Sequence, residues 1–248
     1  MKILKIRNVT VGEGMPKIIA PIVGCNRDAI LAEAEAIARA GADICEWRID
    51  LFAAGDDAKA VIALARELRI PLGDMPLLIT FRTANEGGAK AISPDAYADL
   101  LSEICTARAA DMVDVEMFIA TAPRAIACAR ENGVICVASN HDFAATPSED
   151  EILRRLTCMA DAGADIAKIA VMPGNATDVT TLLRATARAA QTLPCPLITM
   201  SMGRLGAVSR LAGETFGSAC TFGSVGQTSA PGQMPVSELR RALQLLHG

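Results

Sequence analysis

Lys168 is the residue of this chain whose type and position most strongly indicate chemistry. It is the only lysine after Lys90 in the 248-residue sequence, and it lies in the apolar run Asp165–Met172. Such a run predicts a buried strand, where burial disfavours the ammonium and favours the free amine. A free amine can attack a carbonyl carbon to form an imine. The alternative is a structural lysine that pairs with a buried carboxylate or extends from a strand end to solvent.

Charged residues also occupy strand positions that are normally apolar. Period-two alternation places Glu46, Arg48 and Asp50 on one face of a predicted strand. Arg82 and His141 come at the ends of two further predicted strands. Charged groups at the carboxyl ends of several strands are typical of a barrel active site. A purely structural charge network is the alternative, but the cost of burying charges favours a ligand site.

Three further features indicate a polar ligand less strongly. Glu86 lies in a glycine-flanked loop and Arg210 in a helical segment, and either pattern is typical of a solvent-exposed side chain. The segment Phe222–Gln233 is rich in glycine and polar residues, as in loops that close over a ligand. The sequence contains neither a P-loop nor a dinucleotide-binding glycine motif.

The elements that must position these residues follow a repeated pattern of alanine-rich helix, glycine and short strand. Gly41 and Gly163 each follow a helical segment, as expected of a helix C-cap, and they lie 122 residues apart. That distance is close to four units of about 31 residues, and eight such units match the typical ~250-residue TIM barrel. We therefore expect a (β/α)8 TIM barrel, with an open doubly wound sheet as the rival architecture.

The pattern also gives approximate element positions. The expected strands are Lys17–Val23, Asp43–Asp50, Leu77–Arg82, Asp111–Glu116, Val134–Asn140, Asp165–Val171, Pro196–Met202 and Ala219–Phe222. Helical apolar spacing is found in Arg27–Ala40, Pro94–Ala109, Glu149–Ala162 and Val179–Gln191. Short alternation around Gly12 and Gly14 predicts a small N-terminal β-hairpin that plugs one end of the barrel.

Composition narrows the class of protein. Hydrophobic residues make up 51% of the chain and aromatic residues only 3%, which predicts an aliphatic, alanine-rich core. A net charge of −4 gives no reason to expect nucleic acid or an anionic membrane as partner. The eight cysteines are scattered and the histidines number only two, so we expect reduced thiols and no metal site. No run resembles a signal peptide or a transmembrane span, and no composition break divides residues 1–248. We expect one cytoplasmic domain.

Seven motifs in order along the chain carry a resemblance to a known family. They are Glu46–Asp50 (EWRID), Thr80–Gly88 (TFRTANEGG), Ser139–Phe143 (SNHDF), Lys168–Pro173 (KIAVMP), Ile198–Met202 (ITMSM), Ser209–Gly213 (SRLAG) and Ser229–Gln233 (SAPGQ). With the start at Val11–Gly14, the sequence resembles type I 3-dehydroquinate dehydratase over nearly its whole length. The resemblance implies a TIM barrel that dehydrates 3-dehydroquinate to 3-dehydroshikimate in the shikimate pathway of aromatic amino acid biosynthesis. It also implies a homodimer that needs neither a metal nor an organic cofactor.

The same resemblance implies roles for individual residues. Lys168 matches the Schiff-base lysine, His141 the general acid/base and Glu86 the carboxylate that orients this histidine. The implied substrate contacts are Arg210 for the carboxylate, Glu46, Arg48 and Arg82 for the hydroxyls, Ser229 and Gln233 on the closing loop, and Met200 and Met202 on the apolar wall. One departure is Ala20-Pro21, where some members have a serine, so we expect altered hydrogen bonding in that strand.

These residue types suit the implied chemistry. An imine at C3 of the substrate is an electron sink, so removal of the C2 proton gives an enamine. Histidine titrates near neutrality and can take that proton and return one to the departing C1 hydroxyl. An arginine can hold the carboxylate with two hydrogen bonds and so fix the face of the ring that the base meets.

Three alternatives stay open at the level of sequence. A class I Schiff-base aldolase would use the same lysine on the same barrel, but it and a pyridoxal-phosphate enzyme typically need a phosphate-binding loop, which Phe222–Gln233 does not resemble. A non-catalytic metabolite-binding barrel is the third alternative, and it leaves Lys168 and His141 unexplained. Formation of the conjugated enone of dehydroshikimate distinguishes all of these.

Overall fold

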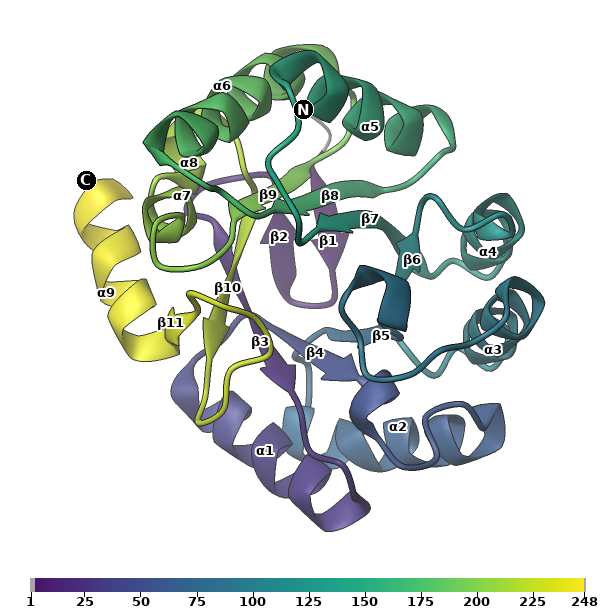
Figure 1. The fold of residues 1–248 in the computed structure, drawn as a ribbon. Coiled ribbons are helices and arrows are strands. Elements are labelled where there is room, and N and C mark those ends of the chain that lie inside the picture. Colours follow the sequence, from purple (N-terminus) through teal and green to yellow (C-terminus); the bar gives the residue numbers. More distant parts are fainter. Residues whose placement is uncertain (1–2, 248) are drawn as a thin grey trace.

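Eight parallel strands form the centre of the structure, a computed structural model that describes residues 3–247 (Figure 1). In chain order they are β3 (Lys17–Ile22), β4 (Ile44–Arg48), β5 (Leu77–Thr80), β6 (Met112–Glu116), β7 (Ile135–Asp142), β8 (Ile166–Val171), β9 (Leu197–Ser201) and β10 (Cys220–Ser224). Each of the eight expected strands is therefore present, and the boundaries differ by at most a few residues.

The sheet closes on itself. Strand β10 pairs with β3 along Cys220–Phe222 and also meets β9, where the amide of Ala219 donates to the carbonyl of Leu197 at 2.7 Å. A short further strand, β11 (Met234–Pro235), pairs with the last two residues of β10, Gly223 and Ser224. Closure confirms the (β/α)8 barrel and excludes the open doubly wound sheet.

Helices surround the barrel (Figure 1). They are α1 (Arg27–Ala40), α2 (Ala58–Leu72), α3 (Pro94–Thr106), α4 (Ala122–Glu131), α5 (Glu149–Asp161), α6 (Ala176–Thr192), the short α7 (Ala207–Leu211) and α8 (Gly213–Phe216), and α9 (Val236–His247). Local signals set their ends: Asn26 caps the first turn of α1, and Gly41 ends it with φ of 76°. The prediction of Arg27–Ala40 as a helix is confirmed at both ends.

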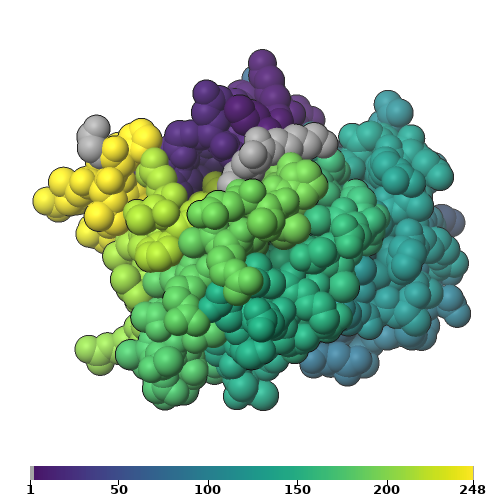
Figure 2. Space-filling model, turned by 90° about the horizontal axis from the view of Figure 1, so that it is seen from above, coloured from purple at the N-terminus to yellow at the C-terminus, as the bar shows by residue number. Residues whose placement is uncertain are grey.

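The N-terminal hairpin closes the end of the barrel where the strands begin. It consists of β1 (Leu4–Ile6) and β2 (Val9–Val11), whose buried Leu4, Ile6 and Val11 pack against apolar residues inside the barrel. Figure 2 shows the hairpin in purple at one end of the molecule. The expected N-terminal hairpin is therefore present, although its strands lie before Gly12 and not around Gly12 and Gly14. The turn is Arg7-Asn8, and Arg7 has the unusual positive φ of 51° there.

Two apolar clusters hold the barrel together. The larger lies between strands and helices and includes Trp47, Phe81 and Tyr97, while the smaller fills the barrel next to the hairpin. Within residues 3–247, no helix combines the length and apolar character needed to cross a membrane. Because the smaller cluster fills the end next to the hairpin, the carboxyl ends of the strands are left to build a pocket.

Candidate active site

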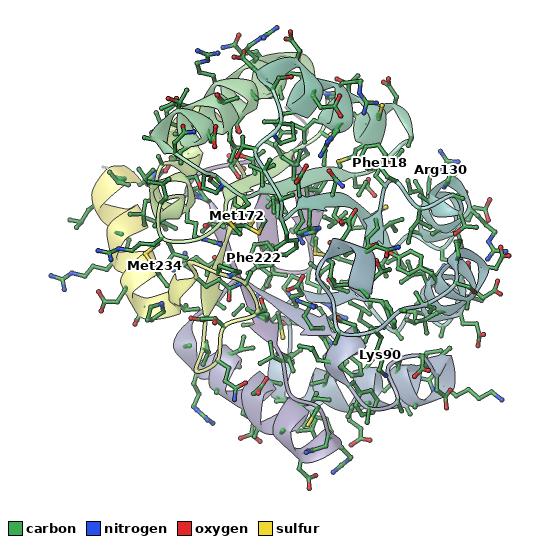
Figure 3. All side chains as sticks on the ribbon, viewed as in Figure 1. Lys90, Phe118, Arg130, Met172, Phe222 and Met234 are labelled. Atoms are coloured by element: carbon green, nitrogen blue, oxygen red, sulfur yellow. The ribbon has the colours of Figure 1, made fainter. Side chains whose placement is uncertain are left out.

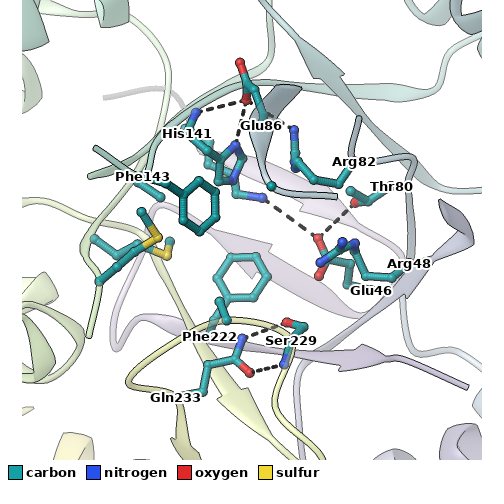
Figure 4. Close-up of a pocket in the computed structure, with 16 residues that line it drawn as sticks. Glu46, Arg48, Thr80, Arg82, Glu86, His141, Phe143, Phe222, Ser229 and Gln233 are labelled. Carbon is teal, nitrogen blue, oxygen red and sulfur yellow. Dashed lines mark hydrogen bonds and ion pairs between the residues drawn. The ribbon is translucent and has the colours of Figure 1, made fainter. Parts of the chain in front are cut away.

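The pocket lies over the carboxyl ends of the strands (Figure 4). Its lining includes ten of the eleven expected site residues: Glu46, Arg48, Arg82, Glu86, His141, Lys168, Met200, Met202, Ser229 and Gln233. Thr80, Phe143 and Phe222 line it as well. Figure 3 shows Phe222 near the barrel axis, whereas Arg130 on α4 lies at the periphery. The fold thus brings six strands, β4, β5, β7, β8, β9 and β10, and loops that follow them to one cavity.

Lys168 comes from β8 and is almost fully buried. Its Nζ lies 3.0 Å from Oδ2 of Asp114, 3.8 Å from Oε1 of Glu46 and 4.8 Å from the centre of the Phe222 ring. The sequence left open a free amine or a lysine paired with a buried carboxylate, and the structure shows the pairing.

His141, on the strand β7 that neighbours β8, forms a hydrogen-bonded pair with Glu86 (Figure 4). Nδ1 of His141 lies 2.9 Å from Oε2 of Glu86, and the backbone amide of His141 donates to the same oxygen at 2.9 Å. Asn140 donates from Nδ2 to the other oxygen, Oε1, at 3.0 Å. An ionised Glu86 accepts all of these bonds, which leaves Nε2 of the neutral imidazole as the basic nitrogen.

Burial shifts both members of this pair toward their neutral forms. It raises the pKa of Glu86 to about 7, since the attraction of Arg82 only partly opposes it. Burial lowers the pKa of His141 well below its ordinary value, and the positive charges of Arg82 and Lys168 add to that effect. His141 is therefore a neutral base at neutral pH, and the charge of Glu86 changes within the physiological range.

Two carboxylates on β6 are site residues that sequence reasoning missed. Asp114 accepts from Arg82 Nη2 at 2.7 Å and from Ser139 at 2.6 Å, while Glu116 accepts from Arg82 Nη1 at 2.8 Å. Although burial acts to raise the pKa of Asp114, Arg82 and Lys168 hold it well below its usual range. The signal was present in Met112–Glu116, where two acids alternate with apolar residues as in β4.

Arg82 reaches the pocket wall with its donors largely in use. Besides its bonds to Asp114 and Glu116, Nη1 donates to Ser139 at 3.1 Å and lies 3.5 Å from Glu86. These partners place a single guanidinium among three carboxylates. Arg82 therefore holds the wall together as well as facing the cavity.

Asp50 does not point into the barrel, contrary to the alternation drawn from the sequence. Strand β4 ends at Arg48, and residues Ile49–Leu51 form a 3-10 turn, so the period of two stops before Asp50. Its carboxylate accepts from Arg48 at 2.8 and 2.7 Å and from the backbone amides of Arg82 and Ala89. Asp50 thereby positions Arg48 and ties the loop after β5 to β4.

Arg210, the eleventh expected residue, lies behind the pocket on α7 with only 1% of its surface exposed. Nη2 donates to the carbonyl of Pro231 at 3.0 Å, Nη1 lies 3.8 Å from Sδ of Met200, and Nε has no hydrogen-bond partner. Burial lowers the pKa of Arg210 to about 10. No carboxylate in residues 3–247 pairs with this buried cation, so an anionic ligand would supply a missing partner.

The loop between β10 and β11 covers one side of the cavity. Oε1 of Gln233 accepts from the amide of Ser229 and its Nε2 donates to the Ser229 hydroxyl, both at 2.9 Å (Figure 4). The loop rests on the turn after β9, where Gly203 donates to the carbonyl of Pro231 at 3.2 Å. Met200 and Met202 supply the apolar wall beside it. The loop is thus folded on itself and fixed to the barrel at one point.

The remaining expectations concern metal and proline. In the described part of the chain, no three His, Cys, Asp or Glu side chains are grouped so as to hold a metal ion. Pro21 lies within β3, between β10 and β4, and pairs in register with Glu46. A proline there removes one ladder donor from a central strand, as expected from the sequence.

Comparisons with known proteins agree with this geometry. Residues 18–248 match the family described as type I 3-dehydroquinase. The chain is 47% identical to the 3-dehydroquinate dehydratase of Bacillus subtilis (strain 168), over 100% of this chain and 98% of that protein. It is 45% identical to the enzyme of the same name from Clostridium kluyveri, over 98% of this chain and 97% of that one.

Solved structures give the same result. The type I 3-dehydroquinate dehydratase of Clostridium difficile superposes with a TM-score of 0.96 at 44% identity, over 99% of this chain and 98% of that one. The 3-dehydroquinate dehydratase of Geobacillus kaustophilus HTA426 also gives 0.96, at 42% identity, over 99% of this chain and 96% of that one.

Proposed function

The chain belongs to the type I 3-dehydroquinase family, and from this premise we propose how its residues dehydrate 3-dehydroquinate. The reaction is that of a lyase in the shikimate pathway, which leads to the aromatic amino acids. Lys168 is the nucleophile, His141 the proton carrier and Glu86 the group that orients it. The observation that carries the proposal is a buried lysine and a neutral, carboxylate-bonded histidine in one cavity.

The covalent step joins Lys168 to the C3 carbonyl of the substrate. Only the unprotonated amine can attack, so a proton on Nζ must leave first, and neutral His141 is the base with the charge state to take it. Attack and loss of one water molecule give the imine. The carboxylates then face an iminium whose positive charge replaces that of the ammonium, so they stabilise the intermediate as well.

Proton transfer follows at the neighbouring carbon. His141 removes the C2 proton, the electron pair moves into the imine as an enamine, and the C1 hydroxyl leaves as water with a proton from the imidazolium. Addition of one water molecule to the resulting conjugated imine releases 3-dehydroshikimate and restores Lys168. Glu86 keeps Nδ1 as the protonated nitrogen, so that Nε2 carries the proton in both directions.

Substrate recognition uses the remaining side chains. Arg210 binds the C1 carboxylate. The burial of its guanidinium with Nε unpartnered supports this role. Glu46, Arg48 and Arg82 contact the ring hydroxyls, Ser229 and Gln233 close the loop over the ring, and Met200 and Met202 pack against its apolar edge.

Product formation tests this function against its alternatives. Purified protein mixed with 3-dehydroquinate should develop the ultraviolet absorbance of a conjugated enone. An aldolase would release a shorter carbonyl compound, and a metabolite-binding barrel would bind substrate without turnover. Absence of the enone with active-site occupancy shown by calorimetry would reject dehydration.

Three broader statements accompany the proposal. We propose that residues 1–248 act as a single catalytic domain, that two chains form a homodimer, and that the enzyme works in the cytoplasm. Sedimentation equilibrium should give the mass of two chains. The mass of a single chain would contradict the dimer.

A further inference from the structure

Asn140 lies between the His141–Glu86 pair and Arg155 on α5 and bonds to both sides. Its Nδ2 donates to Oε1 of Glu86 at 3.0 Å, and its Oδ1 accepts from Nη1 of Arg155 at 2.9 Å. Asn140 is only 8% exposed. The side chain thus joins an ion on α5 to the carboxylate that holds His141.

Arg155 is itself held from two sides. Its Nε donates to Glu151, one turn earlier on α5, at 2.8 Å, and Nη1 also lies 3.3 Å from Asp142 at the end of β7. The side chain is 19% exposed. Its guanidinium therefore has a fixed direction toward Asn140 and does not sample many rotamers.

The chemistry of the two neighbours determines which way the Asn140 amide points. A guanidinium can only donate hydrogen bonds and an ionised carboxylate can only accept them. Arg155 therefore requires the amide oxygen on its side, which turns the NH₂ group toward Glu86. We propose that Arg155 and Asn140 are positioning residues that keep Glu86 ionised and thereby keep His141 as a base. This inference rests on the proposed role of His141.

Glu86 is sensitive to such a contact because opposing charges surround it. The charged and titratable groups that face it are Arg82 after β5, Asp114 and Glu116 on β6, and His141 on β7. Burial and the two β6 carboxylates favour the protonated form, whereas Arg82 and the Asn140 donor favour the ionised form. With the pKa of Glu86 at about 7, a single lost donor changes its charge at neutral pH.

Protonation of Glu86 would remove the base. A proton on Oε2 would point at Nδ1 of His141 at 2.9 Å and turn Nδ1 into an acceptor. The imidazole proton would then reside on Nε2, which could no longer accept a proton from the substrate. Arg155 therefore acts on the reaction through the tautomer of His141, without touching the substrate.

The test is the pH profile of kcat/KM, which reports groups of the free enzyme. In the wild type its acidic limb should lie near the pKa of Glu86, about 7. Arg155→Met should move the midpoint upward by about one pH unit or more, as expected for loss of one hydrogen bond to a carboxylate. At pH above the new midpoint, kcat/KM should recover toward the wild-type value.

Arg154 provides a matched control. It neighbours Arg155 on α5 and donates to the same Glu151 at 2.7 and 2.8 Å, but its other contact is Cys158 and not Asn140. Arg154→Met should leave the midpoint unchanged. Arg155→Lys, which retains a donor, should return the midpoint at least part of the way.

A second variant tests the hydrogen bond between Asn140 and Glu86 without a change in α5. Asn140→Asp replaces the donor with a carboxylate beside Glu86, so the midpoint should rise at least as far as in Arg155→Met. A uniform loss of rate at every pH, with the midpoint unchanged in Asn140→Asp and Arg155→Met, would overturn the inference and leave both residues structural.

Glu86→Gln separates failure of this inference from failure of the proposed mechanism. If Glu86→Gln retains the wild-type acidic limb, then Glu86 does not govern His141 and the proposed mechanism is wrong at that point. If Glu86→Gln abolishes the limb while Arg155→Met and Asn140→Asp leave it in place, only the inference fails.

Discussion

A lysine nucleophile must be held by its neighbours and then released as a free amine, and Lys168 has two carboxylates for the first task. Asp114 and Glu46 lie 3.0 and 3.8 Å from its Nζ. Attack on a carbonyl carbon requires the unprotonated amine. Activation therefore depends on where the proton goes, and this makes His141 relevant to imine formation as well as to dehydration.

Covalent trapping checks the identity of the nucleophile. Borohydride added with 3-dehydroquinate should reduce an imine on Lys168, because Lys168 is the only lysine among residues 3–247 that lines the pocket. Lys168→Ala should lose the adduct and nearly all activity. Peptide mapping by mass spectrometry that places the adduct on Lys17, Lys59 or Lys90 would reject the assignment.

Removal of His141 separates proton transfer from attachment. His141→Ala should lower the dehydration rate by about 10²–10⁴, the usual contribution of a positioned acid/base. Some borohydride-trappable adduct should still form, more slowly, since Lys168 supplies the amine. Full dehydratase activity in this variant would contradict the mechanism, because the other histidine, His247, pairs with Glu214 on α8.

Removal of Arg210 tests carboxylate recognition. Arg210→Ala should raise KM strongly, since truncating one partner of a buried charge pair costs about 2–5 kcal/mol. Part of the effect should appear in kcat, because the same contact orients the ring. The exposed Arg204 in the turn after β9 is a suitable control, and Arg204→Ala should leave steady-state KM unchanged.

At the scale of the elements, the parts that were predicted are those with local signals. Apolar runs and C-cap glycines located the strands and four of the helices within a few residues. The sequence did not locate the hairpin turn, because Arg7 adopts a positive φ that glycine normally supplies. Asp50 was wrongly placed on the strand, because nothing in Glu46-Trp47-Arg48 signals that the strand ends at Arg48.

Site residues were predicted where a charged residue interrupts an apolar pattern. Their contacts were missed where the partner lies on another strand or helix. Glu46, Arg82 and His141 were identifiable from strand ends. Lys168 on β8 pairs with Asp114 on β6 across the intervening strand β7. This contact depends on the arrangement of the strands in the sheet and has no local signal in the sequence. The bond between Arg155 and Asn140 likewise joins a helix to a strand and has no spacing signature.

The loop between β10 and β11 offers a paired test of docking. Gly226 and Gly232 have φ of 78° and 80°, but a Cβ at Gly232 would lie 2.3 Å from the carbonyl oxygen of Gly203, whereas a Cβ at Gly226 meets nothing. Both alanine variants carry similar backbone strain. Gly232→Ala should additionally displace the loop and raise KM about tenfold, the equivalent of ~1.4 kcal/mol. Equal KM values in the two variants would mean that the docked loop does not contribute to substrate binding.

At the scale of the whole molecule, the buried charges of the site oppose the stability of the barrel. The hairpin and the apolar cluster inside the barrel fill one end, while the other end buries Asp114 and Glu116 and half-buries Glu86 around a cavity. A carboxylate kept in such a place is favourable for proton transfer and unfavourable for folding. The cost for Glu86 is measurable because its titration lies near neutrality.

Glu86 should make the protein less stable as pH rises. Its pKa is about 7 in the folded chain and about 4.5 when exposed, so below pH 4.5 both states are protonated and Glu86 has no effect. Between pH 4.5 and 7 the folded state binds the extra proton, and raising the pH therefore destabilises it. Above pH 7 the loss is complete, up to about 3 kcal/mol. Urea unfolding at pH 5 and pH 8 should show this loss in wild type relative to Glu86→Gln, which has no carboxyl to titrate. The same pH dependence in both proteins would show that Glu86 ionises in the folded chain as it does in water.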